Sequence, residues 1–233
     1  MKALLFDFGG TLDTNGVHWA EKFWDLYQQF NIVLTKEEFM CAYIFAERSL
    51  GEQSPLNGVS FRETVAKQLS LQFDALASSP AARVELQRNR IPEMALSCYD
   101  EVRVVTKRAQ ELLHILKATY KLGVVSNFYG NLTTVCEELG FDNIFDTLID
   151  SAVVGVRKPD PHIFELALLR LGVDPRECTV IGDSYDRDIV PAKMLGCKTI
   201  WLRVQCLVQS TDTRQADFII HDLDEIVYCL KHK

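Results

Sequence analysis

Short runs of consecutive apolar residues recur along the chain, and helical patterns separate most of them. The first run, Ala3–Phe8, is interrupted only by Asp7 and stops at Gly9–Gly10, which is typical of a strand buried on both faces. Further runs predict strands at residues 122–126, 147–151, 179–182, 199–202 and 218–220. Because strands that alternate with helices build parallel sheets, the pattern predicts an α/β fold with a doubly wound, Rossmann-like parallel sheet core.

A long helical block interrupts this alternation after the first strand. Between residues 17 and 88 the apolar positions recur at helical spacing. Thr35 and Ser60 each stand three residues before a glutamate, the pattern of a capping box that opens a helix. We therefore predict an inserted all-α cap. The predicted boundaries are 16–99 for the cap, and 1–15 with 100–233 for the core.

Two poorly patterned segments, 51–58 and 89–100, are predicted as loops or linkers. Residues 106–120 predict a helix that leads into the second strand. The length of 233 residues exceeds one small domain and falls short of two full ones. One domain with a sizeable insertion fits this length.

Composition and charge narrow the expected partners. The 48% hydrophobic and 24% charged contents are those of an ordinary globular chain. The net charge of −7 argues against binding to nucleic acid or to an anionic membrane. Residues 83–108 are locally basic, but acidic residues interrupt them, so we expect a solvated face there.

The cysteines and the amino-terminal run bear on the cellular compartment. Seven scattered cysteines include no C-x-x-C pair, so we expect them to be reduced and mostly buried. The amino-terminal apolar run has no small-residue cleavage site after it, and no run approaches the ~18 apolar residues of a membrane span. These features predict a cytoplasmic protein.

Polar side chains follow four of the predicted strands. Asp7 ends the first strand, Ser126–Asn127 the second, Lys158 follows the third, and Asp183 follows the fourth with Asp188 close behind. Each residue alone is compatible with turn capping or a solvated loop. Because ligands of open parallel sheets bind outside the carboxyl ends of the strands, we expect these side chains to line one crevice.

The four segments together resemble the haloacid dehalogenase (HAD)-like superfamily of hydrolases, which phosphatases dominate. The matching motifs are Asp7-x-Gly9-Gly10-Thr11-Leu12, Val125-Ser126-Asn127, Lys158-Pro159-Asp160-Pro161 and Gly182-Asp183-Ser184-x-x-x-Asp188-Ile189. They occur in order along the whole chain. The helical block lies between the first and second motifs, where one subfamily carries a helical cap.

The resemblance implies a magnesium-dependent phosphatase that acts on a small phosphorylated metabolite. Asp7 would be the nucleophile and a metal ligand, with the Gly9 carbonyl and Asp183 as further ligands and Asp188 supporting the metal site. Ser126, the Asn127 backbone and Lys158 would hold the phosphoryl group. The physical chemistry agrees, because a carboxylate that attacks a phosphate dianion needs an intervening cation, and hard oxygen ligands favour Mg²⁺.

One position departs from the family pattern. Many family phosphatases carry an acid two residues after the nucleophile to protonate the leaving group, and this chain has Gly9 there. The alternatives are a phosphatase whose leaving group needs little help or is helped by substrate or cap, a dehalogenase or phosphonate hydrolase, and a non-catalytic ligand-binding or interaction module. The phosphonate alternative would require a cap lysine such as Lys22, Lys36 or Lys67. Four cap residues are candidates for substrate contact, and the first could also supply the missing proton: His18, Trp19, Arg48 and Tyr43.

Overall fold

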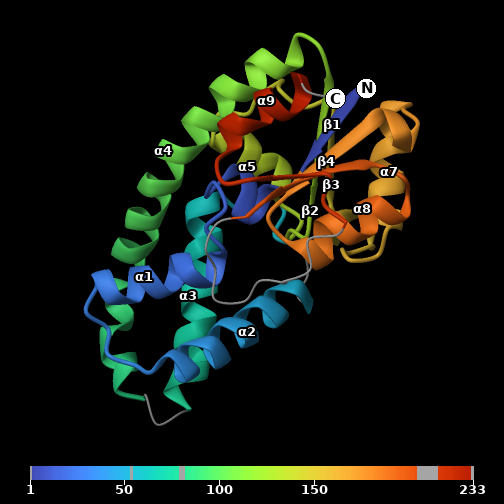
Figure 1. Cartoon of the computed structure of the whole chain (residues 1–233). Coiled ribbons are helices and arrows are strands. Elements are labelled where there is room, and N and C mark those ends of the chain that lie inside the picture. The colour runs from blue at the N-terminus through green and yellow to red at the C-terminus, as the bar shows by residue number, and fades with distance from the viewer. Residues whose placement is uncertain (1, 53–54, 79–81, 204–214, 232–233) are drawn as a thin grey trace.

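The computed structural model describes residues 2–52, 55–78, 82–203 and 215–231. Within these residues a six-stranded parallel sheet has the order β3-β2-β1-β4-β5-β6 (Figure 1). The strands are β1 (Ala3–Phe6), β2 (Lys121–Ser126), β3 (Thr147–Asp150), β4 (Cys178–Gly182), β5 (Lys198–Leu202) and β6 (Phe218–Ile220). The predicted strands and the doubly wound parallel sheet are confirmed. The strands that follow β1 in sequence lie on both sides of it, β2 and β3 on one side and β4 to β6 on the other. In sheets of this kind, ligands bind in the crevice outside the carboxyl ends of the strands at this position.

Both faces of the sheet are covered by helices, as its apolar strands require. Leu4 and Phe6 of β1 pack in one core with α4 (Ile91–Lys117), α5 (Leu132–Glu138) and α9 (Ile226–Lys231). Ala3 and Leu5 pack in a second core on α7 (His162–Leu171) and beside α8 (Val190–Met194). The short α6 (Ser151–Val154) follows β3 directly. Alternate β1 residues therefore belong to opposite faces, because side chains alternate across a strand.

Between β1 and β2 the described residues form helices joined by turns and loops, with no strand among them. The helices of this segment are α1 (Trp19–Gln29), α2 (Lys36–Glu52), α3 (Phe61–Ala77), a short helical segment (Ala82–Arg90) and α4. Both predicted capping boxes are present. At the start of α2 the Thr35 N–H donates to the Glu38 side chain and the Glu38 N–H donates to the Thr35 hydroxyl. At the start of α3, Ser60 and Glu63 form the same reciprocal pair. The aromatic stripe of α1 packs against α2 through Trp24, Tyr27 and Phe39.

The predicted loop at 89–100 is wrong, because α4 runs without a break from Ile91 to Lys117. The helix passes from the cap helices to the sheet (Figure 1). Met94, Cys98 and Val102 are buried on one side of it, which explains why a segment with an early proline and polar residues is helical. The predicted domain boundary at 99/100 lies inside this helix and stays a prediction. The predicted loop at 51–58 begins within α2, and residues 53–54 lie outside the described residues.

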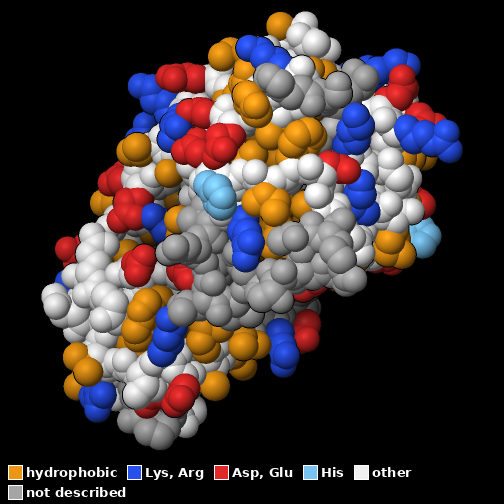
Figure 2. Space-filling model, viewed as in Figure 1, with side chains coloured by type: hydrophobic (Ala, Val, Ile, Leu, Met, Phe, Trp, Pro, Cys, Tyr) orange, Lys and Arg blue, Asp and Glu red, His pale blue; other side chains and the backbone are white. Residues whose placement is uncertain are grey.

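The surface carries charges of both signs (Figure 2), and most of the described cysteines are buried. Acidic and basic side chains are interspersed on the face shown in Figure 2. Five of the six described cysteines are buried and Cys41 is exposed, while Cys206 lies outside the described residues. No helix in the described ranges is both long enough and apolar enough to cross a membrane.

Candidate active site

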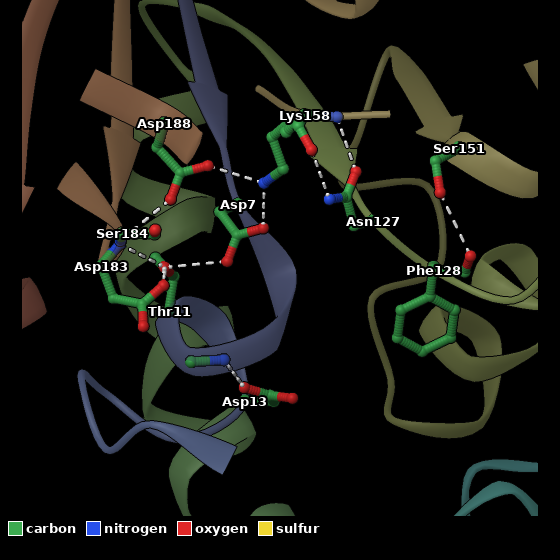
Figure 3. Close-up of polar contacts among 11 residues, drawn as sticks. Asp7, Thr11, Asp13, Asn127, Phe128, Ser151, Lys158, Asp183, Ser184 and Asp188 are labelled. Carbon is green, nitrogen blue, oxygen red and sulfur yellow. Dashed lines mark hydrogen bonds and ion pairs between the residues drawn. The ribbon is translucent and has the colours of Figure 1, made fainter. Parts of the chain in front are cut away.

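Four charged side chains meet at the carboxyl ends of β1 and β4. Asp7 directly follows β1, and its backbone N–H donates to the Ile181 carbonyl at 2.9 Å, which continues the strand pairing into the site. Asp183 follows β4, and Asp188 lies in the helical turn Tyr185–Ile189. Lys158 arrives from the loop that precedes α7 (Figure 3). The sequence-based expectation of one shared crevice matches this geometry.

Lys158 bridges two of the carboxylates. Its Nζ lies 2.5 Å from Asp7 Oδ1 and 2.6 Å from Asp188 Oδ1. Only 5% of Lys158 is exposed, against 5% of Asp7 and 1% of Asp188. A buried ammonium held by two carboxylates has little freedom to move, so these contacts fix Lys158 Nζ beside the oxygen atoms of Asp7.

The pKa values reflect more carboxylates than the lysine can balance. Burial raises the pKa of Asp7 to about 6, against the lowering effect of Lys158. Burial, Asp7 and Asp188 raise the pKa of Asp183 well above its usual range. Burial alone would lower the pKa of Lys158, but Asp188 and Asp7 raise it above its usual range, so its ammonium stays charged. The site is short of positive charge.

These carboxylates have the chemistry of a divalent-cation site. Asp7, Asp183 and Asp188 each offer an oxygen, and the three oxygens lie within 4.8 Å of one another. Mg²⁺ prefers such hard oxygen ligands and commonly uses one or two carboxylates with waters. Gly9, the fourth residue predicted at the metal, lines the same cavity. The residues present therefore fit a magnesium ion.

Thr11 connects the first and fourth motifs. Its Oγ1 lies 3.2 Å from Asp7 Oδ2 and 3.4 Å from Asp183 Oδ1, and it accepts the Asp183 N–H at 3.1 Å. Gly10 has φ +96°, and a Cβ on it would meet Asp183 Oδ2 at 2.5 Å. Glycine is required at position 10, because both the backbone conformation and the close carboxylate exclude a side chain.

The Asn127 side chain holds the Lys158 segment. Its Nδ2 donates to the Lys158 carbonyl at 2.9 Å, and its Oδ1 accepts the Lys158 N–H at 2.8 Å. This reciprocal pair is a positioning contact that the sequence did not predict. Ser126 is 2% exposed and lines the cavity, where its hydroxyl is in reach of a ligand.

The site opens into a cavity of about 450 Å³ between the cap helices and the sheet. His18, Trp19 and Tyr43, three of the four predicted cap residues, line it. Arg48 is exposed and is not among the lining residues. Of the three lysines considered for Schiff-base chemistry, Lys36 lines the cavity, whereas Lys22 pairs with Glu101 and Lys67 is exposed.

Asp13 is a cavity residue that the sequence analysis missed. It is 1% exposed and accepts the Gly10 N–H at 2.8 Å and the Trp19 indole N–H at 2.9 Å. Burial raises its pKa to about 7, although both hydrogen bonds act in the opposite direction. Asp13 lies close to Asp7 in the sequence, which could have marked it as a site residue. An Asp that follows glycines is equally typical of an ordinary turn, so this position alone does not distinguish the two.

A family profile matches most of the chain. Residues 1–196 match the hydrolases described as haloacid dehalogenase-like. Glyceraldehyde 3-phosphate phosphatase of Pyrococcus furiosus is 30% identical over 137 residues, which cover 57% of this chain and 56% of that protein. The pyrimidine 5'-nucleotidase YjjG of Escherichia coli is 29% identical over 146 residues, which cover 62% and 64%. The chain thus spans less than two thirds of the length of these curated relatives.

Solved structures share the complete fold at low sequence identity. The putative HAD-hydrolase YfnB from Bacillus subtilis, bound to magnesium, has a TM-score of 0.60 and 20% identity, and the match covers 99% of this chain and 98% of that one. A structure described as a dehalogenase has a TM-score of 0.66 and 19% identity, with 100% and 98% covered. With the match over residues 1–196, these findings show that the chain belongs to the haloacid dehalogenase-like hydrolase family.

Proposed function

We propose that the protein is a magnesium-dependent phosphatase that hydrolyses a small phosphorylated metabolite through an aspartyl-phosphate intermediate. The observation that carries this proposal is the contact of Lys158 Nζ with Asp7, 2.5 Å away, in a group of three carboxylates at the cavity floor. This arrangement places a nucleophilic carboxylate, a fixed ammonium and a group of carboxylates suited to a metal ion beside one another. The phosphatase names of the curated relatives support the same class.

The proposed reaction has two steps. An Asp7 oxygen attacks the phosphorus atom, and the bond to the leaving oxygen breaks as that oxygen takes the electron pair and then a proton from solvent. Water then attacks the phosphorus of the aspartyl phosphate, which releases inorganic phosphate and restores the Asp7 carboxylate. Lys158, the Ser126 hydroxyl and the Asn127 backbone hold the phosphoryl oxygens during both steps. Asp188 keeps Lys158 in place at 2.6 Å.

Magnesium, held by Asp7, Asp183 and the Gly9 carbonyl with support from Asp188, would supply the positive charge between the attacking carboxylate and the phosphate. Such charge is needed because Lys158 is shared between Asp7 and Asp188. A metal-free dehalogenase would have no use for the third carboxylate, Asp183. This acidic set therefore favours phosphoryl transfer over displacement at carbon.

The experiment that tests the proposal is a screen of phosphorylated metabolites, each assayed for phosphate release with and without magnesium. We expect hydrolysis of a subset of the panel, and only with magnesium present. If no phosphate ester is hydrolysed with magnesium, including p-nitrophenyl phosphate, the alternative of a non-catalytic ligand-binding module replaces this proposal. Hydrolysis that is unaffected by removing magnesium would contradict the metal assignment.

A further inference from the structure

The cavity wall contains a second polar cluster. Glu47 of α2 is half-buried and lines the same cavity as Asp7. Its Oε1 accepts a hydrogen bond from Tyr129 Oη at 2.7 Å and another from Gln68 Nε2. Gln68 belongs to α3, and Tyr129 lies two residues after Asn127 in the loop that follows β2. The cluster therefore joins two cap helices to an active-site loop.

Both internal hydrogen bonds use the same oxygen of Glu47. In the part of the chain that the structure describes, Glu47 Oε2 accepts no hydrogen bond and Glu47 forms no ion pair. Two neutral donors thus fix the carboxylate at the cavity wall, and one oxygen stays available. Arg187 and Lys36 line the same cavity, but neither forms an ion pair with Glu47 in the described residues. A half-buried carboxylate that is paired with no cation is expected to gain from an incoming donor, because its charge is incompletely compensated.

Gln68 adds a second unused acceptor. It is 3% exposed and lines the cavity, and its Oε1 has no hydrogen-bond partner within the described ranges of the chain. The amide orientation is set by chemistry, since the carboxylate of Glu47 can only accept and the Gln68 NH₂ group must face it. Burial raises the pKa of Tyr129 well above its usual range, and Glu47 adds to the rise, so its hydroxyl stays protonated and donates.

The surroundings suit the carbon skeleton of a ligand. Trp19, Phe39 and Tyr43 line the cavity together with the cluster, and Phe39 and Tyr43 stack with ring centroids 6.1 Å apart. The charges of both Glu47 and Asp183 act on the Tyr43 hydroxyl, whose pKa burial raises well above its usual range. Tyr43 is therefore within electrostatic reach of the cluster and of Asp183. A phosphate ester seated at Lys158 would extend its leaving group along this aromatic wall.

We propose that Glu47, oriented by Gln68 and Tyr129, forms a leaving-group subsite that selects phosphate esters whose alcohol part carries a hydroxyl or ammonium donor. The inference rests on the proposed phosphatase function and adds the substrate class. Selection of this kind is effective, because a substrate that lacks the donor leaves a desolvated acceptor unpaired.

The test compares four phosphate esters as probes. p-Nitrophenyl phosphate and n-pentyl phosphate lack a donor, 5-aminopentyl phosphate carries an ammonium, and ribose 5-phosphate carries hydroxyls. Glu47→Gln is the informative variant, because its amide oxygen can still accept from Gln68 and Tyr129 while an NH₂ donor replaces the free oxygen. Glu52→Gln is the matched control, since Glu52 is an exposed residue of the same helix and does not line the cavity.

We expect the wild type to prefer at least one donor-bearing ester over n-pentyl phosphate. Glu47→Gln should lower kcat/KM for that ester about tenfold or more and change p-nitrophenyl phosphate turnover less than about threefold. The ammonium and hydroxyl probes distinguish the two donor sources. Glu52→Gln should match the wild type on all four probes.

Two results would overturn the subsite, and they differ from failure of the phosphatase proposal. If the wild type hydrolyses p-nitrophenyl phosphate but shows no preference for either donor, the subsite is wrong and the phosphatase stands. The same holds if Glu47→Gln lowers turnover of all four probes equally. If the wild type hydrolyses none of the probes or the wider metabolite panel, the phosphatase and the subsite fall together.

Discussion

The indole Nε1 of Trp19 lies 3.5 Å from the position that a Cβ on Gly9 would occupy. This is where the general acid of many related phosphatases would project. Trp19 instead donates its indole N–H to Asp13 at 2.9 Å. The tryptophan thus covers the position of the missing acid, and its N–H is already used inside the protein.

We predict that wild-type turnover depends steeply on the pKa of the leaving alcohol, because position 9 supplies no proton. Aryl phosphates should react well and simple alkyl phosphates poorly. The measurement is kcat/KM across a series of esters under conditions where formation of the aspartyl phosphate limits the rate. A flat dependence would show that another cavity group, with His18 or Asp13 as candidates, protonates the leaving oxygen.

The backbone at Gly9 allows a repair of this defect. Its φ of −75° and ψ of 114° suit any residue, and a Cβ would make an ordinary contact with Trp19. Gly9→Asp should raise turnover of alkyl phosphates about tenfold or more relative to aryl phosphates, since general acid catalysis is typically worth about 10² to 10⁴ in rate. Gly9→Asn is the control, because it has the same shape without the acid. Equal effects of both variants would argue against proton donation.

Asn127 should act through Lys158. Asn127→Ala removes both hydrogen bonds to the Lys158 backbone, so the ammonium loses its fixed position and kcat should fall about 10- to 100-fold. Loss of these bonds should cost about 1 kcal/mol each in the free energy of unfolding. Turnover and denaturant unfolding measure the two effects, with exposed Asn89→Ala as the control. Unchanged kcat in the folded variant would remove the positioning role.

Metal removal tests the acidic set. Exhaustive chelation should stop turnover, and added magnesium should restore it, because the carboxylates alone would repel a phosphate dianion. Asp183→Ala should lose the magnesium response, whereas exposed Asp142→Ala should keep it. Titration of turnover against magnesium concentration measures both. An Asp183→Ala enzyme that works without added magnesium would point back to metal-free displacement.

His18 should make stability depend on pH. Burial and then Arg187 lower its pKa below 6.5 in the folded state, so the unfolded chain binds the proton more readily. Stability is therefore lost as pH falls through about 6.5. His18→Asn keeps an acceptor for the Ala20 N–H, and its free energy of unfolding should fall less than that of the wild type between about pH 7 and about pH 5.

His162→Asn is the matched control, and its effect on the pH dependence of stability should have the opposite sign. Exposed His162 has a raised pKa because its ring bonds to Asp160, so its contribution is lost as pH rises. His162→Asn should therefore fall more than the wild type over the same interval. Parallel curves for the wild type and His18→Asn would show that His18 does not titrate differently on folding.

The sheet was predictable because buried parallel strands are nearly continuous apolar runs. The site could be placed for the same reason, since Asp7, Ser126 and Asp183 lie at the carboxyl ends of recognisable strands and topology brings strand ends together. Lys158 lies in the connection that follows another such strand. Capping boxes at Thr35 and Ser60 likewise depend only on local chemistry. Each of these features is determined by a few neighbouring residues, so it can be predicted from a short stretch of sequence.

Other features depend on contacts between distant residues. The start of α4 is helical because Met94 and Cys98 are buried against the cap, which no local pattern announces. The pairing of Asn127 with the Lys158 backbone joins residues 31 positions apart. Glu47 and Tyr129 are 82 positions apart, and each alone is typical of an ordinary surface or core residue. Such long-range hydrogen bonds require the folded structure.

The most direct test of the account is magnesium-dependent phosphate release from p-nitrophenyl phosphate by the wild type and by Asp7→Asn. The variant keeps the shape of the side chain and removes one carboxylate from a crowded site, so it should fold with undiminished thermal stability. We predict that the wild type turns over and that Asp7→Asn is slower by at least about 10³-fold, because an amide cannot replace the attacking oxygen. A folded Asp7→Asn protein with near wild-type turnover would contradict the covalent mechanism.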